Sequence, residues 1–91
     1  MPPGVAEQVE LSQKYSAAAT RATRARNQLL QWQQVHGASA VPAKVAAARD
    51  HIPAQLQATV LAMASRNSVQ TEQTLQTLAA SAAVIEEFLA H

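Results

Sequence analysis

Apolar residues recur along the first part of the chain at alternating spacings of four and three residues. This is the a/d spacing of a heptad repeat, which places the residues on one face of a long helix. We therefore predict a helix over residues 5–36, ended by Gly37, because glycine suits the position after a helix C-terminus. The residues of this face, called the main seam below, are Leu11, Tyr15, Ala18, Ala22, Ala25, Leu29 and Trp32, with His36 in the next position.

Alanine fills the middle of the main seam, and bulkier residues lie at its two ends. A seam of alanine lets a second helix approach closely, so we expect the main seam to close within the chain. Val5, Val9 and Leu30 lie off the main seam and indicate a second contact face on the same helix.

A break in the pattern follows at residues 37–41, where we predict a turn. Proline is tolerated in the first turn of a helix, so Pro42 predicts a short helix over residues 42–49. Asp50 can cap a last helix over residues 51–90, with Pro53 in its first turn. One continuous helix kinked at Pro53 is the alternative, and the sequence leaves both open.

The last predicted helix carries two sets of apolar residues that are out of phase by one residue. The first set is Leu56, Val60 and Met63, and the second is Leu75, Leu78, Ala82, Ile85 and Leu89. A stutter of four residues around residues 66–68 would reconcile the two sets, and it would locally unwind any supercoil.

These elements predict an all-α fold for the single domain 1–91: an antiparallel helical hairpin with two long helices and a short connecting helix. Hydrophobic residues make up 48% of the chain, but many are alanine, which buries little surface. In a hairpin of two helices, each helix also has one side that the other helix does not cover. We therefore expect two hairpins to form a four-helix bundle, by dimerisation or with another hairpin. The alternative is a monomeric three-helix bundle in which residues 42–49 pack across.

Helix length indicates where such a partner would bind. At about 1.5 Å per residue, the first predicted helix is roughly 48 Å long and the last roughly 57 Å. If residues 42–49 continue into the last helix, the C-terminal stretch would extend past the first helix and leave its apolar residues uncovered. The candidate partner interface is therefore Val5, Val9, Leu75, Leu78, Ile85, Phe88 and Leu89.

Basic residues gather in the middle of the first predicted helix, at Lys14, Arg21, Arg24 and Arg26, although the net charge is only +1. They could contact an acidic partner or nucleic acid. They could also be surface residues whose stems cover the alanine seam. We favour the surface interpretation, because no aromatic residue lies among the arginines to stack on bases.

The sequence shows no arrangement of residues typical of a catalytic or metal-binding site. It has no cysteine and no glycine-rich phosphate loop. His36 has no second ligand three or four residues on, and neighbouring Glu86 and Glu87 point about 100° apart on a helix. We expect no enzyme activity, no catalytic residue and no metal, cofactor or small-molecule ligand. No apolar run is long enough to span a membrane, no signal peptide pattern begins the chain, and the compartment is not indicated.

A tryptophan lies just before the predicted break, in Trp32-Gln33-Gln34-Val35-His36-Gly37. With two long helices and an Ala/Gln/Ser/Thr-rich chain, this outline resembles the WXG100 (early secreted antigen) family of helical hairpins. The resemblance implies type VII secretion and action as a homodimer or heterodimer. The chain departs from the family's Trp-x-Gly, since Gly37 lies five residues after Trp32, and it lacks the family's C-terminal Tyr-x-x-x-Asp/Glu. Such departures would suit a divergent member of the family, or a partner within a secreted pair that does not carry the secretion signal.

The expected function is that of a non-enzymatic interaction protein that dimerises or pairs with another helical protein. Two alternatives remain at this level. One is an accessory structural subunit of a larger phage or organellar complex. The other is a small nucleic-acid-associated module that uses its basic residues.

Overall fold

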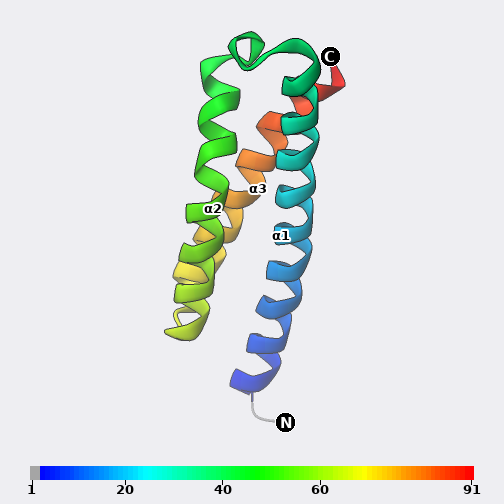
Figure 1. Ribbon diagram of the computed structural model, residues 1–91. Coiled ribbons are helices and arrows are strands. Elements are labelled where there is room, and N and C mark those ends of the chain that lie inside the picture. The colour runs from blue at the N-terminus through cyan, green and yellow to red at the C-terminus, as the bar shows by residue number, and fades with distance from the viewer. Residues whose placement is uncertain (1–2) are drawn as a thin grey trace.

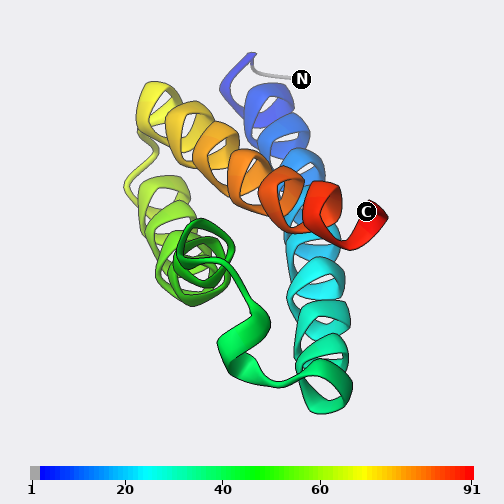
Figure 2. The ribbon, with the colours of Figure 1, turned by 90° about the horizontal axis from the view of Figure 1, so that it is seen from above.

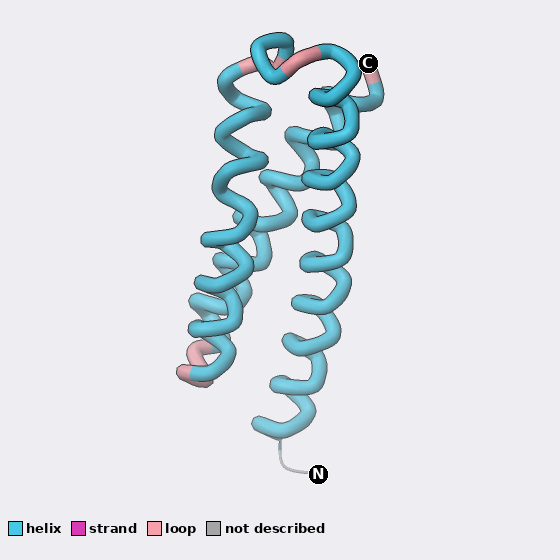
Figure 3. Tube along the Cα trace, viewed as in Figure 1, coloured by secondary structure: helices cyan, strands magenta, loops and turns pink. Residues whose placement is uncertain are grey.

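The computed structural model describes residues 3–91, so residues 1 and 2 of the predicted domain lie outside it. Its elements are α1 (Pro3–His36), the 3₁₀ turn η1 (Ala38–Ala40), α2 (Ala43–Ala64) and α3 (Ser68–Ala90). The helices run up, down and up in a bundle of 51 × 17 × 16 Å (Figures 1 and 3). Residues 3–91 contain no strand, so the predicted all-α class is confirmed.

Gly37 follows the last residue of α1, at the position that the sequence predicts. Its φ of 91° is strained for other residues, and its N–H donates to the Gln33 carbonyl at 2.7 Å. Pro42 then lies in an extended conformation (φ −59°, ψ 151°) and precedes the first residue of α2. The Pro42 carbonyl accepts the N–H of Ala46 at 2.9 Å, which starts the helix.

The second half of the chain divides differently from the prediction. In place of helices over 42–49 and 51–90, α2 continues through Pro53, as in the alternative of one continuous helix, but it ends at Ala64. The reason is that one buried face continues on both sides of Pro53, which is itself exposed. Proline removes one N–H donor from the helix, but burial of the whole face outweighs that loss. The buried residues of α2 are Val45, Ala48, Ile52, Thr59 and Ala62.

The chain reverses direction at residues 65–67, where the sequence predicts a stutter. Arg66 has a φ of 57° and donates its N–H to the Met63 carbonyl, while Asn67 donates its N–H to the Ala62 carbonyl, both at 3.0 Å. These two bonds are those of a Schellman motif. The Asn67 side chain then caps α3 by accepting the N–H of Gln70 at 3.1 Å. The two apolar sets are out of phase because they belong to two different helices.

Arg66 occupies a left-handed position where glycine has no steric cost. We expect Arg66→Gly to raise the free energy of unfolding of the monomer by about 0.5–1 kcal/mol. Denaturant unfolding at low protein concentration would measure this. The control is Ser65→Gly, because Ser65 has a right-handed φ of −79° and should not be stabilised by glycine. Equal effects at both positions would contradict the assignment.

The third helix, α3, packs against both other helices and lies obliquely to α1 when viewed from above (Figure 2). The largest fully buried side chains are Leu29, Ile52, Leu78 and Ile85, which belong to one cluster with Ala22, Ala25 and Ala82. Two further core positions, Thr59 and Thr71, are polar. Each hydroxyl donates at 2.8 Å to the carbonyl four residues earlier, so neither is unpaired in the core.

Candidate interaction surface

The main seam of α1 faces the other two helices. Ala22, Ala25 and Leu29 are 0–2% exposed and belong to the core cluster. Leu11 is also buried. At the ends and flanks of this face, Tyr15, Ala18 and Trp32 are half-buried. The alanine-rich middle of α1 is thus covered from within the chain.

The predicted partner interface is corrected by the burial of three of its residues. Leu75, Leu78 and Ile85 are 8%, 0% and 0% exposed and so are not available to a partner. The reason is the chain reversal after α2, which returns α3 along α1 instead of extending it beyond α1. The remaining predicted residues divide into two kinds: Phe88 and Leu89 are half-buried, and Val5 and Val9 are exposed.

Aromatic contacts explain the half-burial of Trp32 and Phe88 at the C-terminal end of α1. The Trp32 and Phe88 rings meet in a T-shaped arrangement with centroids 4.9 Å apart, and the Trp32 ring stacks on the His36 ring at 4.3 Å. Nδ1 of His36 also lies 3.1 Å from the Trp32 carbonyl oxygen.

On the α2 side, Arg49 donates to Gln33 at 2.6 Å and to Asp50 at 2.8 Å. The hydrogen bond from Arg49 lowers the pKa of the Asp50 carboxyl.

Two of the four basic residues that could contact a partner, Lys14 and Arg21, are paired with carboxylates on α3. Lys14 donates to Glu72 at 3.1 Å, and this hydrogen bond raises the pKa of Lys14. Arg21 donates to both oxygens of Glu86 at 2.6–3.1 Å, which lowers the pKa of Glu86 below its ordinary value of 4.5. The four residues therefore do not form one free basic stripe.

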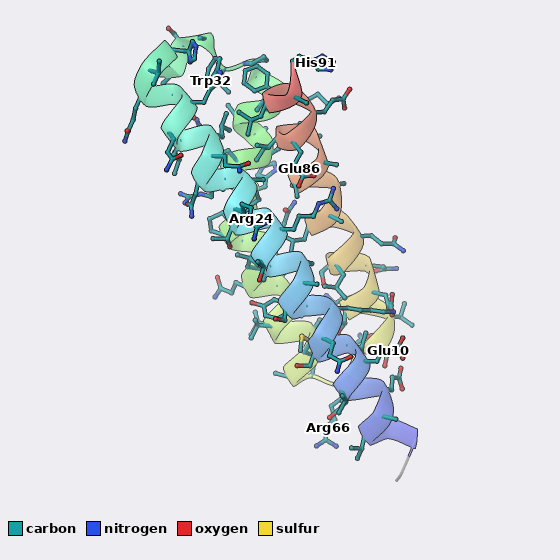
Figure 4. All side chains as sticks on the ribbon, turned by 90° about the vertical axis from the view of Figure 1, so that its right-hand side faces the viewer. Glu10, Arg24, Trp32, Arg66, Glu86 and His91 are labelled. Atoms are coloured by element: carbon teal, nitrogen blue, oxygen red, sulfur yellow. The ribbon has the colours of Figure 1, made fainter. Side chains whose placement is uncertain are left out.

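The other two basic residues, Arg24 and Arg26, differ in exposure. Arg24 is exposed on α1 (Figure 4). Arg26 is half-buried, and its Nε is buried without a hydrogen-bond partner in the part of the chain that is described. Arg24 is thus accessible to a second molecule, while the stem of Arg26 lies partly against the bundle.

The Arg21–Glu86 pair gives a pH-dependent prediction. Its side chains are 46% and 40% exposed, so we expect a coupling free energy of only about 0.2–1 kcal/mol at neutral pH. Because the pKa of Glu86 is lower in the folded chain than in the unfolded chain, this stabilisation is present above the ordinary value of 4.5. It is lost as the pH falls through the folded-state pKa.

A double-mutant cycle of Arg21→Gln and Glu86→Gln, followed by denaturant unfolding at neutral and acidic pH, measures this coupling. The matched control is a second cycle that leaves Glu86 unchanged and combines Arg21→Gln with Glu87→Gln. This cycle should show no coupling. A coupling that persists in acid would contradict the ion-pair assignment.

A second heptad pattern runs along the flank of α1 beside the main seam, about 100° around the helix from it. Its members, called the outer seam below, recur at spacings of four and three residues and include the off-seam residues Val5, Val9 and Leu30. No charged residue occurs among its first six members. Most are exposed, and Ala19, Arg26 and Leu30 are half-buried. The outer seam consists of Val5, Val9, Ser12, Ser16, Ala19, Thr23, Arg26 and Leu30.

The surface is hollowed at two places beside the outer seam. A groove of about 610 Å³ lies between the first turns of α1 and the α2–α3 turn, and it is lined by Val5, Ser12 and Met63 among others. A depression of about 540 Å³ follows on α1, lined by Ala19 and Thr23. The short side chains of the outer seam thus leave room beside the helix.

Exposed large hydrophobic side chains gather at one end of the bundle. Of the six among residues 4–91, only Val35 lies at the end that holds the α1–α2 connection. The other five lie at the opposite end, which holds the first turns of α1 and the α2–α3 turn with Arg66 (Figure 4). They are Val5, Val9, Val60, Leu61 and Val69, with exposures of 45–70%.

No family model, curated protein or solved structure matches this chain. Among residues 3–91, no group of three or more histidine and acidic side chains is placed to hold a metal ion. The described helices also include none long and apolar enough to cross a membrane.

The sequence interpretation missed most of the outer seam, because its serine, threonine and alanine members are not strongly apolar. The pattern that could have revealed it is the spacing of small uncharged residues between Val9 and Leu30.

Proposed function

We propose that this chain is a non-enzymatic interaction protein that binds a helical partner protein through the outer seam of α1. The observation that carries the proposal is the uncharged face that this helix presents from Val5 to Thr23, which is exposed except at the half-buried Ala19. A helix surface that meets only water gains solubility from charged residues, so a long face without them is suited to contact with protein.

The form of the surface favours a helix as the partner. The heptad spacing of the outer seam is that of helices which pack side by side. Short side chains at Ser16 and Ala19 permit a close approach of two backbones, and Val5 and Leu30 supply apolar area at the two ends. The resemblance to the WXG100 family would make the partner a second small helical protein of a secreted pair.

The two alternatives fit these observations differently. An accessory subunit of a larger complex would use the same outer seam, so it is a variant of the proposal. A nucleic-acid-associated module has less support, because Lys14 and Arg21 are engaged by Glu72 and Glu86.

Site-specific photo-crosslinking in the native cells tests the proposal. A photoreactive residue in place of Ser16 should give a discrete covalent adduct with a protein. The matched control is the same residue in place of Ala83, which is also exposed but lies on α3, and it should give no such adduct. Absence of an adduct at Ser16, or equal adducts at both positions, would overturn the proposal.

A further inference from the structure

We propose that the outer seam forms one wall of a groove between α1 and α2, and that this groove binds one amphipathic helix of a different protein, with a carboxylate of that helix opposite Arg26. This inference rests on the proposed function and specifies the chemistry of the partner. It follows from the two walls of the groove, from their lack of charge, and from the arginine at one end of it.

The two flanks of α1 face different helices. Arg21, one position before the main seam, binds Glu86 of α3. Gln33, one position after the main seam, accepts a hydrogen bond from Arg49 of α2 at 2.6 Å. The outer seam also lies one position after the main seam, so it borders the side of α1 on which α2 lies.

The second wall of the groove comes from α2. Arg49, which contacts α1, follows a buried residue of α2 by one position, and Val60 and Met63 do the same. Leu56 lies one turn before Val60 on the same flank. Met63 also lines the groove of about 610 Å³ together with Val5 of the outer seam. This flank, called the α2 wall below, consists of Leu56, Val60 and Met63.

The groove is open on the side away from α3. In two perpendicular views, α3 covers α1 and α2 from one side (Figures 1 and 2), and residues 3–91 place no helix on the opposite side. Val5 and Val9 on one wall and Val60 on the other are exposed. The open side is thus the position that a fourth helix occupies in a four-helix bundle.

The two walls favour a helix as the occupant. From Val5 to Thr23 the outer seam has no charged member, and the α2 wall has none either. This stretch of α1 is about 27 Å long, which is the length of a helix of about eighteen residues. An extended segment would find no free backbone groups on two helices, whereas a helix pairs its own and binds a groove through one apolar stripe.

Arg26 determines the charge that the occupant should carry. It lies one heptad before Gln33, near the end at which Arg49 joins the two helices. The pKa of Asp50 is lowered chiefly by its hydrogen bond from Arg49 and also by the charge of Arg26, so Arg26 lies on the α2 side of α1.

The guanidinium of Arg26 has no carboxylate of its own. Asp50 is bound to Arg49, and Arg26 makes no ion pair among residues 3–91. Its Nε is buried without a hydrogen-bond partner in the same part of the chain. A partly buried cation is stabilised by a charge-assisted hydrogen bond, so a helix in the groove gains from an Asp or Glu at this height.

Photo-crosslinking from the α2 wall tests the groove. A photoreactive residue in place of Val60 should give an adduct with the same protein as the one in place of Ser16. Mass spectrometry should place the two crosslinks on one segment of that protein, within about eighteen residues of each other. The matched control is the next residue, Leu61, which is 59% exposed but lies on the outer side of α2, and it should give no such adduct.

Charge reversal tests the carboxylate. Arg26→Glu should lower the yield of the Ser16 adduct by about tenfold or more, because two like charges would then meet in the groove. Lys44→Glu, at an exposed position of α2 outside the α2 wall, makes the same change of charge and should leave the yield unchanged. Circular dichroism establishes that each variant is folded. Arg26→Gln removes the charge at similar size and should also lower the yield, which keeps the test decisive if Arg26→Glu does not fold.

The outcomes separate this inference from the proposed function. An adduct at Ser16 without one at Val60, crosslinks on distant segments of the partner, or adducts between two copies of this chain would overturn the groove and keep the proposed function. A yield unchanged in the folded Arg26 variants would overturn the carboxylate. Absence of any protein adduct at Ser16 would overturn both the inference and the proposed function.

Discussion

Leu78→Ala is expected to lower the free energy of unfolding by about 2–5 kcal/mol. Leu78 is fully buried in the core cluster, where α3 packs against α1 and α2. Removal of its side chain loses the transfer free energy of the buried groups and leaves a cavity between the three helices. A domain of this size has only about 5–15 kcal/mol of total stability, so the variant should be partly unfolded well below the wild-type midpoint.

Thermal unfolding followed by circular dichroism measures the effect, and the midpoint should fall by at least about 10 °C. The matched control is Leu61→Ala, because Leu61 is 59% exposed in α2 and its removal leaves no cavity. We expect the control to stay within about 0.5 kcal/mol of wild type. Similar losses at both positions would show that the burial assigned to Leu78 is wrong.

Large apolar residues at regular spacing were sufficient to predict α1 from the sequence. Leu11, Leu29 and Trp32 mark the two ends of the main seam, and their phase fixes which alanines lie between them on the same face. Gly37 ends the helix for a local reason, because its positive φ is strained for other residues. Both features depend on short stretches of sequence, so periodicity and turn chemistry describe them well.

The second half of the chain could not be divided correctly because its turn carries neither glycine nor proline. Arg66 adopts the left-handed conformation that glycine would favour, and Asn67 caps α3 from a position that looks like helix interior in the sequence. Pro53 is the stronger helix-breaking residue by rule, yet it lies inside α2. The burial of Ile52 in the core stabilises α2 as a helix that continues through Pro53.

The predicted apolar set of Leu56, Val60 and Met63 does not coincide with the buried face of α2. Hydrophobicity favours Val60 as a core residue, but Val60 is 47% exposed, while Thr59 and Ala62 are buried. Thr59 can occupy the core because its hydroxyl donates a hydrogen bond to the Gln55 carbonyl. The periodicity of apolar residues does not reveal this bond. The error in the partner interface comes from the missed chain reversal after α2, since a helix that continued past residue 66 would have left Leu75 and Leu78 uncovered.

Ala22→Leu is expected to destabilise the fold by about 1–3 kcal/mol, because it adds bulk where none fits. Ala22 is 0% exposed, so its methyl group is already in contact on all sides and a larger side chain must push α1 away from the helices that cover it. The matched control is Ala17→Leu in the same helix, at an exposed position with the same helix-propensity change. Denaturant unfolding of both variants separates overpacking from helix propensity. If Ala22→Leu melted like Ala17→Leu, the core would have room beside α1, and alanine would not be required for the close approach of the helices. A loss at Ala22 alone would mean that the alanine centre of the main seam sets the spacing of the bundle.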